Sequence, residues 1–380
     1  MKDSEPSAIV TDILQKSEFA DLYRKVQSGQ RLSREDGLRL YRSSDIIAIG
    51  HLANVVRERK NGDAAYYVVN VHINYSNVCK NKCRFCAFSR GSSHDEGAYE
   101  MTVEEVLERA KRVKLVGATE LHIVGGAHPD WLFSRYLQMI GKLHNAFPDV
   151  HLQAFTAVEV AHIAEVAKLS VRETLVELKK AGLGSLPGGG AEIFSPRVRS
   201  LVCPEKLSGE RWLEVMREAH RLGIRSNATM LYGHVETDEE RIDHMLKLRE
   251  LQDETGGFMS FIPLAFHPAN TQLSEQPGTT GMTDLKSLAI GRLMLDNFDH
   301  IKAFWIMLGI KLAQVSLWFG VDDIDGTVVE ERITHSAGAE TPQALTVQEL
   351  RRLILEAGRV PVERDTLYRY VEREPMGALE

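Results

Sequence analysis

The sequence predicts an α/β fold built from six strand–helix units, with helical additions before and after them. From about Tyr66 onward, short apolar runs alternate with amphipathic helical stretches, an order that produces parallel sheets with right-handed crossovers. Loops that hold cysteines, paired glycines and polar residues follow the strands, and α/β barrels place their sites at those carboxyl ends. We therefore expect a barrel, with a flat doubly wound sheet as the alternative.

The first expected strand covers residues 67–75. Its odd positions are apolar or aromatic, whereas Asn70, His72 and Asn74 occupy even positions and face the other side. That polar face suits a hydrated barrel interior, although the alternation also fits a strand that is half-exposed to solvent. The loop after this strand holds cysteines and lacks the GxGxxG fingerprint of dinucleotide-binding sheets, which favours the barrel.

Five further strands and their helices follow. The strands are expected at residues 121–124, 151–156, 183–186, 224–231 and 258–264. Helices are expected to begin after Thr102, Ser170 and Thr237, because a glutamate three residues after each of them completes a capping box. Apolar periodicity predicts two more helices, over about residues 131–147 and 208–221.

The segments on either side of these units are expected to be mainly helical. We expect an N-terminal helical extension over residues 1–62, the barrel over residues 63–320 and a C-terminal extension over residues 321–380. Within the last segment, Thr346 and Glu349 form a capping box that precedes an apolar helical stretch.

Composition excludes several classes of protein. A chain of 380 residues with 43% hydrophobic and 26% charged residues is typical of a globular protein with one large domain. A net charge of -7 provides no basic footprint for nucleic acid or an anionic membrane. The N-terminus has no signal-peptide pattern, and no apolar run is long enough to span a membrane. We therefore expect a cytoplasmic protein, in a reducing compartment.

Three cysteines lie close together in the loop after the first expected strand. Cys79, Cys83 and Cys86 have the spacing CxxxCxxC, and thiolates this close bind a shared ion or cluster. A 4Fe–4S cluster normally has four cysteine ligands, so three would leave one iron with an open position for a small molecule. A structural zinc site prefers four ligands in separated pairs and is disfavoured. A simple electron carrier would need a fourth ligand, and Cys203 lies far along the chain.

The cysteine loop and several longer runs together resemble a group of radical S-adenosylmethionine (SAM) enzymes, those of the futalosine pathway and of deazaflavin biosynthesis. The resemblance covers about residues 40–370 and is strongest to the aminofutalosine synthase branch of menaquinone biosynthesis. The matching runs are residues 74–88, 125–130, 154–159, 186–194, 227–237, 261–268 and 325–330. The cysteine spacing is shared across a very large superfamily, whereas these longer runs are more specific.

This resemblance implies a partial (β/α)₆ barrel that holds one 4Fe–4S cluster and uses SAM as a co-substrate. It implies that a 5′-deoxyadenosyl radical adds to the vinyl carbon of 3-[(1-carboxyvinyl)oxy]benzoate, an enol ether with two carboxylates. Rearrangement and loss of one carboxyl group as bicarbonate then give aminodeoxyfutalosine. A reductant such as flavodoxin or ferredoxin is the implied partner. The rival members are the dehypoxanthine futalosine cyclase and the deazaflavin-cofactor synthase subunit.

The resemblance also assigns residues to the site by position. Cys79, Cys83 and Cys86 are the implied cluster ligands. The implied SAM contacts are Gly125, Gly126, Thr156, Glu159, Glu192 and Arg211. The candidates for substrate binding and catalysis are Tyr75, Arg90, His234 and His267; two buried carboxylates need cationic or donor partners. A hydrogen-bonded structural role is the alternative for each histidine, and a solvated surface position is the alternative for Arg211.

Overall fold

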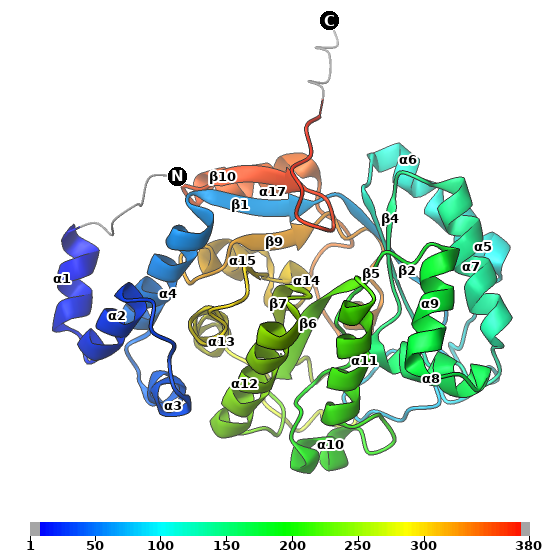
Figure 1. Ribbon diagram of the computed structural model, residues 1–380, viewed down its shortest axis with the longest axis horizontal. Coiled ribbons are helices and arrows are strands. Elements are labelled where there is room, and N and C mark those ends of the chain that lie inside the picture. The colour runs from blue at the N-terminus through cyan, green and yellow to red at the C-terminus, as the bar shows by residue number, and fades with distance from the viewer. Residues whose placement is uncertain (1–7, 374–380) are drawn as a thin grey trace, which may run out of the picture.

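The computed structural model describes residues 8–373 and contains a curled, fully parallel sheet of seven strands (Figure 1). Each strand pairs with the next one along the chain, in the order β2-β3-β4-β5-β6-β7-β8. A doubly wound sheet reverses its strand order at a switch point, so the flat-sheet alternative is wrong. The strands are β2 (Asn70–Asn74), β3 (Glu120–Val124), β4 (His151–Ala154), β5 (Ser185–Leu186), β6 (Arg225–Tyr232), β7 (Phe258–Ala265) and β8 (His300–Ile301).

Helices cover the outside of this sheet (Figure 1). They are α5 (Val103–Ala110), α6 (Arg112–Val116), α7 (Phe133–Ala146), α8 (Ala157–Ala167), α9 (Val171–Ala181), α10 (Pro196–Val202), α11 (Gly209–Arg221), α12 (Asp238–Thr255) and α13 (Gly281–Met294). The capping boxes predicted at Thr102, Ser170 and Thr237 are all present. Helix α8 was not predicted as a separate helix; it begins directly after β4, with Thr156 as its N-cap.

All six predicted strands of the barrel are present, with two differences in detail. The seventh strand, β8, is only two residues long, so it has too few positions to show an alternating pattern. The first predicted strand is two strands, because the chain leaves one sheet at Val69 and enters another. Strand β1 (Ala64–Val68) pairs with β9 (Asp323–Gly326) and β10 (Val360–Arg364) in a separate parallel sheet of three strands.

The segment over residues 322–331 closes the gap between the two edges of the seven-stranded sheet. At the β8 edge, the Ala303 amide donates to the Asp323 carbonyl (2.8 Å). At the β2 edge, the Asn70 amide donates to Thr327 Oγ1 (3.0 Å), whose hydroxyl donates to the Asn70 carbonyl (2.8 Å). The Val328 amide donates to the Asn70 side chain (2.8 Å). The returning chain thereby turns an open half-barrel into an enclosed one.

Both extensions pack directly on the barrel (Figure 1). The N-terminal helices are α1 (Ala8–Lys16), α2 (Ala20–Gln27), α3 (Arg34–Arg42) and α4 (Ile46–Asn61), of which α3 and α4 contact α12 and α13. Helices α14 (Trp305–Leu308) and α15 (Ile310–Ser316) fall before the predicted C-terminal extension. The extension itself contains α16 (Ile333–Ser336) and α17 (Val347–Glu356) together with strands β9 and β10, so it is less helical than expected. The predicted capping box at Thr346 begins α17. No helix within residues 8–373 is long and apolar enough to cross a membrane.

His335 links the closing segment to the loop that follows it. Its Nδ1 bonds the Glu331 carboxylate (3.0 Å) and its Nε2 bonds the Thr341 carbonyl (2.9 Å). Both nitrogens face acceptors, so the ring is a cation. The hydrogen bond to Glu331 raises the pKa of His335 to about 9, although burial opposes the shift.

The variant His335→Gln is expected to lower the free energy of unfolding by about 1 kcal/mol, because a charge-assisted hydrogen bond to a partly solvated ring is lost. The pKa of His335 is higher in the folded protein than its unfolded value of about 6.5, so the protonated ring stabilises the folded state. This stabilisation is complete below pH 6.5 and is lost as the pH rises through about 9. Melting temperatures of both proteins at pH 6 and pH 10 measure the effect. The exposed His94→Gln variant is the control, and an equal loss at both pH values would contradict this account.

Candidate active site

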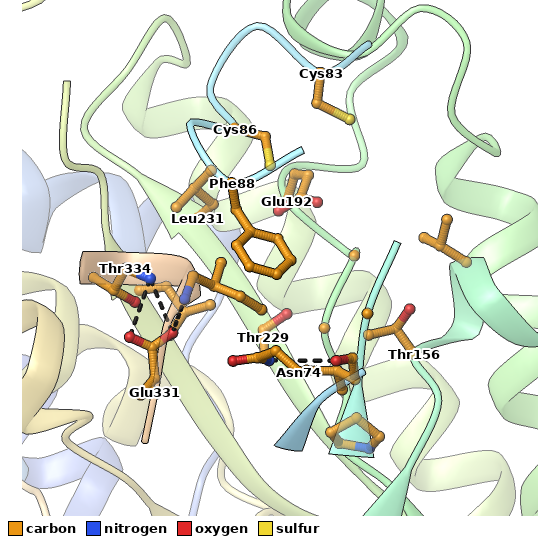
Figure 2. Close-up of a pocket in the computed structure, with 18 of the residues that line it drawn as sticks. Asn74, Cys83, Cys86, Phe88, Thr156, Glu192, Thr229, Leu231, Glu331 and Thr334 are labelled. Carbon is orange, nitrogen blue, oxygen red and sulfur yellow. Dashed lines mark hydrogen bonds between the residues drawn. The ribbon is translucent and has the colours of Figure 1, made fainter. Parts of the chain in front are cut away.

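The barrel encloses a cavity of about 320 Å³ at the carboxyl ends of the strands. Figure 2 shows Cys83 and Cys86 at one end of it and Asn74 and Thr229 at the other. The even-numbered polar face predicted for the first strand lies inside, because His72 and Asn74 line the cavity. The strands and the closing segment also contribute His122, Gln153, Asn227, Ile262, Lys302 and Asp325.

The cysteine loop forms the mouth of the cavity. All three cysteines line it; Cys83 is buried, and Cys79 and Cys86 are half-buried. The Cys79 amide donates to the Arg90 carbonyl (2.8 Å) and the Lys80 amide to the Ala127 carbonyl (2.9 Å). The Ala127 amide donates to Cys79 Sγ (3.3 Å). These bonds fix the loop with its sulfurs toward the interior.

Three cysteine sulfurs on one cavity and an amide hydrogen bond to one of them are a donor set that fits an iron–sulfur cluster. Burial raises the pKa of Cys83 to about 12, although Lys206 opposes the shift, and burial also raises the pKa of Cys79. Thiolates are the ligand form, so a metal must supply positive charge to hold these sulfurs deprotonated. An amide bond to a ligand sulfur, as on Cys79, is a feature that tunes such clusters. Cys203 is buried nearby and does not line the cavity.

The paired glycines after β3 allow the cysteine loop to approach the sheet. A Cβ on Gly126 would lie 2.1 Å from the Val78 carbonyl oxygen, and one on Gly125 would lie 2.7 Å from the Tyr75 ring. No side chain fits in either place. The Gly126 amide donates to the Ser76 carbonyl (2.9 Å), so the two segments are also hydrogen-bonded.

A buried carboxylate joins these segments to α8. Glu159 accepts hydrogen bonds from the Tyr75 hydroxyl (2.6 Å) and the Gly125 amide (3.0 Å) through one oxygen. Its other oxygen accepts from the Thr156 amide (2.8 Å) in a capping box. Burial raises the pKa of Glu159, although these donors oppose the shift. Thr156 and Glu159 line the cavity, whereas Tyr75 lies behind the glycines.

The glycine loop over residues 187–190 is tightly held, unlike the flexible loop that its composition suggests. The Thr229 hydroxyl donates to the Gly188 carbonyl (2.9 Å), and Trp212 Nε1 donates to the Gly189 carbonyl (3.1 Å). Gly188 has a positive φ of 86°, and a Cβ there would lie 2.3 Å from the Asn227 carbonyl. The glycines therefore serve close backbone packing.

Glu192 follows that loop and forms a buried ion pair with Lys206. Burial raises the pKa of Glu192, but the Lys206 ammonium outweighs it and the net shift is downward. Lys206 also lies over the Phe85 ring, 5.3 Å from its centroid. The pair brings one positive and one negative group to the cavity beside Cys83.

Four of the candidates lie away from the cavity. Tyr75 is buried behind Gly125. The Arg90 guanidinium donates to the carbonyls of its own loop, including that of Ser89 (2.9 Å). The Arg211 side chain is 52% exposed and pairs with Glu214 (2.7 Å).

His234, the fourth, uses both ring nitrogens locally. Its Nδ1 accepts from the Val235 amide (2.8 Å), and its Nε2 donates to the Leu231 carbonyl (3.0 Å). Burial lowers the pKa of His234, so the ring is neutral. His267 does line the cavity, where its Nε2 donates to the Met307 carbonyl (2.8 Å).

Sequence reasoning missed both lysines that line the cavity. Lys206 stands in an irregular loop between α10 and α11, and Lys302 follows the two-residue strand β8. Neither position carries a periodic pattern. The sequence offers one signal for each lysine. Lys206 follows Glu192 at a short separation along the chain, and Lys302 is the polar residue directly after His300–Ile301.

A parallel half-barrel with a cysteine loop at its first strand defines a class of enzymes that use a cluster for radical chemistry. Residues 73–248 match the Radical SAM superfamily, and residues 255–376 match the CofH/MqnC C-terminal region. A Thermus thermophilus aminodeoxyfutalosine synthase is 54% identical, over 91% of this chain and 94% of that protein. The chain therefore belongs to the radical SAM superfamily, in the group with this C-terminal region, and is a radical SAM enzyme.

Other relatives and solved structures agree. An aminodeoxyfutalosine synthase of Streptomyces coelicolor is 44% identical, over 92% of each chain. A 5-amino-6-(D-ribitylamino)uracil–L-tyrosine 4-hydroxyphenyl transferase of Methanopyrus kandleri is also 44% identical, over 82% of this chain and 85% of that protein. Methylornithine synthase has the same fold, with a TM-score of 0.72 at 18% identity over 90% of this chain and 97% of the other.

The variant Gly126→Ala is expected to displace the cysteine loop, because its methyl group would overlap the Val78 carbonyl. We expect destabilisation of about 1–3 kcal/mol and less than half of the wild-type iron and sulfide after anaerobic reconstitution. Gly141→Ala is the matched control: a Cβ there meets no atom within 4 Å, and alanine favours a helix by up to about 1 kcal/mol. Equal iron content in both variants would refute this role of Gly126.

Proposed function

We propose that the protein is an aminodeoxyfutalosine synthase. In this reaction SAM, 3-[(1-carboxyvinyl)oxy]benzoate and water give aminodeoxyfutalosine, methionine, bicarbonate and a proton. The observation that carries the proposal is 54% identity, over 91% of the chain, to a relative of that name. The cavity supports it, because it combines three cysteines, an ion pair and a deeper polar chamber.

Cys79, Cys83 and Cys86 are the proposed ligands of one 4Fe–4S cluster. When bound, such a cluster with one open iron supplies the electron that cleaves SAM to methionine and a 5′-deoxyadenosyl radical. The chain holds the sulfurs inward through the loop bonds of Cys79 and Lys80. The ring of Phe88, which points from this loop toward the cavity (Figure 2), limits access of water to that end.

The SAM site is proposed between the cysteine loop and the glycine loops. Gly125 and Gly126 allow a close approach of backbone groups, and Thr156 lies beside Gly189. Glu192 provides an acceptor for the SAM ammonium or ribose, and Lys206 provides a cation for its carboxylate. Lys206 takes this role in place of Arg211, because Arg211 is exposed and paired elsewhere.

Apolar side chains form another part of the cavity wall. The lining includes Leu231, Ile262, Leu264, Phe266, Phe304 and Met307. A dry wall protects a reactive carbon from side reactions with water. His267 Nδ1 has no hydrogen-bond partner within residues 8–373, so it is the proposed atom for proton transfer at this wall.

A 4-hydroxyphenyl transferase activity is the second candidate, because relatives with that name are up to 44% identical. The higher identity to the synthase favours the first proposal. Membership of a family of radical SAM enzymes decides against a simple electron carrier.

The reductant is proposed to be an acidic one-electron carrier such as flavodoxin or ferredoxin. The cluster loop exposes Lys80, Lys82 and Arg84 between its cysteines, although the chain as a whole has a net charge of -7. A local basic surface attracts an acidic partner to the cluster. We also propose a cytoplasmic location, where buried free thiols stay reduced.

The activity test uses reconstituted, reduced protein with SAM and 3-[(1-carboxyvinyl)oxy]benzoate under anaerobic conditions. We expect aminodeoxyfutalosine and methionine in equal amounts by mass spectrometry. Free 5′-deoxyadenosine without the adduct would contradict the synthase and direct attention to the cyclase substrate. A parallel assay supplies SAM with L-tyrosine and 5-amino-6-(D-ribitylamino)uracil, and formation of their 4-hydroxyphenyl adduct there would instead establish the transferase.

The two cationic candidates for SAM are separated by paired variants. Lys206→Met is expected to weaken SAM binding by about 10- to 100-fold, as a charge-assisted hydrogen bond is lost, whereas Arg211→Met leaves it unchanged. Equilibrium dialysis with the oxidised cluster measures affinity, and iron content checks that the site is intact. A loss in Arg211→Met alone would return the role to Arg211.

A further inference from the structure

The floor of the cavity is a polar layer below the proposed SAM site. His72 pairs in register with His122 on the next strand, and their rings stack with centroids 4.3 Å apart. Gln153, which follows in register, bonds His122 Nδ1 (3.1 Å). Lys302, from the far edge of the sheet, reaches the same layer. Three strands and the residue that follows β8 thus contribute polar groups to one level of the barrel.

Lys302 lies well below the mouth of the cavity. Strands β7 and β8 pair Ser260 with His300, which puts Lys302 level with Ile262. Strand β7 continues three residues further, to Ala265, or about 10 Å at the rise of a parallel strand. The proposed SAM site and the cysteine loop lie at the upper end, so Lys302 faces the distal end of any substrate.

Lys302 is also the only cation at this level among the described residues that line the cavity. The other lining lysine, Lys206, is paired with Glu192 at the mouth. Burial lowers the pKa of both His72 and His122, and Lys302 itself adds to the effect. Both histidines are therefore neutral, and the positive charge of the floor resides on one ammonium group.

We propose that Lys302 binds the ring carboxylate of the substrate, and that the cavity floor is a subsite for a benzoate anion. This inference rests on the proposed function. The vinyl group must meet the adenosyl carbon near the mouth, and the ring carboxylate is at the opposite end of the molecule. A buried carboxylate is costly unless it is paired, and the floor offers it this one ammonium.

The carboxyl group of Asp325 pairs with Lys302 at the floor. Its Oδ1 lies 3.2 Å from Lys302 Nζ, and the backbone at Asp325 has a positive φ of 64°. Burial raises the pKa of Asp325, and Asp323 adds to the rise, although Lys302 opposes it. Asp325 is therefore a weak competitor that becomes neutral more readily than an ordinary aspartate. Glu120, one step deeper, also lines the cavity and accepts a hydrogen bond from the Asn70 side chain (3.3 Å). Burial opposes ionisation of Glu120, but the Lys302 ammonium outweighs it and the net shift of the Glu120 pKa is downward, so a bound carboxylate shares Lys302 with this anion.

The test compares two ligands that differ only in the ring carboxylate, 3-[(1-carboxyvinyl)oxy]benzoate and 2-phenoxyacrylate. Equilibrium dialysis uses the holoenzyme with its cluster oxidised, so that no turnover occurs. The wild type is expected to bind the dicarboxylate about 10- to 100-fold more tightly. Lys302→Met removes this preference.

Further variants keep the result interpretable. Lys302→Met leaves the Asp325 carboxylate buried without its ion-pair partner, which destabilises the fold. The double variant with Asp325→Asn removes both charges of the pair and is expected to fold. It is also expected to show no preference for the dicarboxylate. Asp325→Asn alone is expected to retain or increase the preference, because a competing carboxyl charge is gone. Lys311→Met, at an exposed lysine on α15, is the matched control and is expected to bind as the wild type.

The outcomes separate this subsite from the proposed function. A preference that survives in the double variant, or a wild type that binds both ligands equally or neither, overturns the subsite. Turnover with reduced enzyme is measured independently. A preference that depends on Lys302 without formation of aminodeoxyfutalosine would support the subsite and reject the synthase assignment.

Discussion

The enclosed cavity depends on the hydrogen bonds between Asn70 and Thr327. They join the first strand of the barrel to a segment that returns from the C-terminal region, and they do so at the one gap that the seven strands leave. Without that segment, Asp325 and Glu331 would be absent from the wall, and the polar layer of His72 and Lys302 would be open to water. The electrostatic properties of the floor therefore depend on a closure directly beside it, because Asn70 also contacts Glu120.

The mouth depends on a different constraint, the close contact of backbones. Gly126 touches the cysteine loop, and Gly188 touches the backbone at Asn227. Only glycine fits at these positions, because a Cβ would overlap the neighbouring backbone. The same contacts bring buried thiols, whose pKa values are raised by burial, to face the pair of Lys206 and Glu192. The cavity therefore has two chemically distinct halves: a mouth with buried thiols, close backbone contacts and the Lys206–Glu192 pair, and a floor of neutral histidines with Lys302.

Sequence reasoning recovered the parts of this structure that rest on local patterns. Strand alternation and capping boxes predicted six barrel strands and the helices that begin at Thr102, Ser170 and Thr237, and the cysteine spacing predicted the loop at the mouth. It missed β8, because two residues are too few to show an alternating pattern. It also merged β1 with β2, because the alternation of apolar and polar residues does not reveal that the chain passes from one sheet to another. Arg90 and His234 resembled ligand groups until their contacts with neighbouring backbone were visible. Lys302 escaped notice because only the tertiary register places it beside His72.

The closure at Asn70 spans 257 residues of chain, and this has a consequence for assembly. Loop-closure entropy for a span of that length is roughly 5 kcal/mol before any constant term, and contacts of such long range form late in folding. During synthesis, the cysteine loop leaves the ribosome long before the closing segment exists. The cysteines thus pass through a period in which the barrel lies open beside them. Delivery of iron and sulfide in that interval would meet accessible thiols, whereas delivery after closure must pass through the finished mouth.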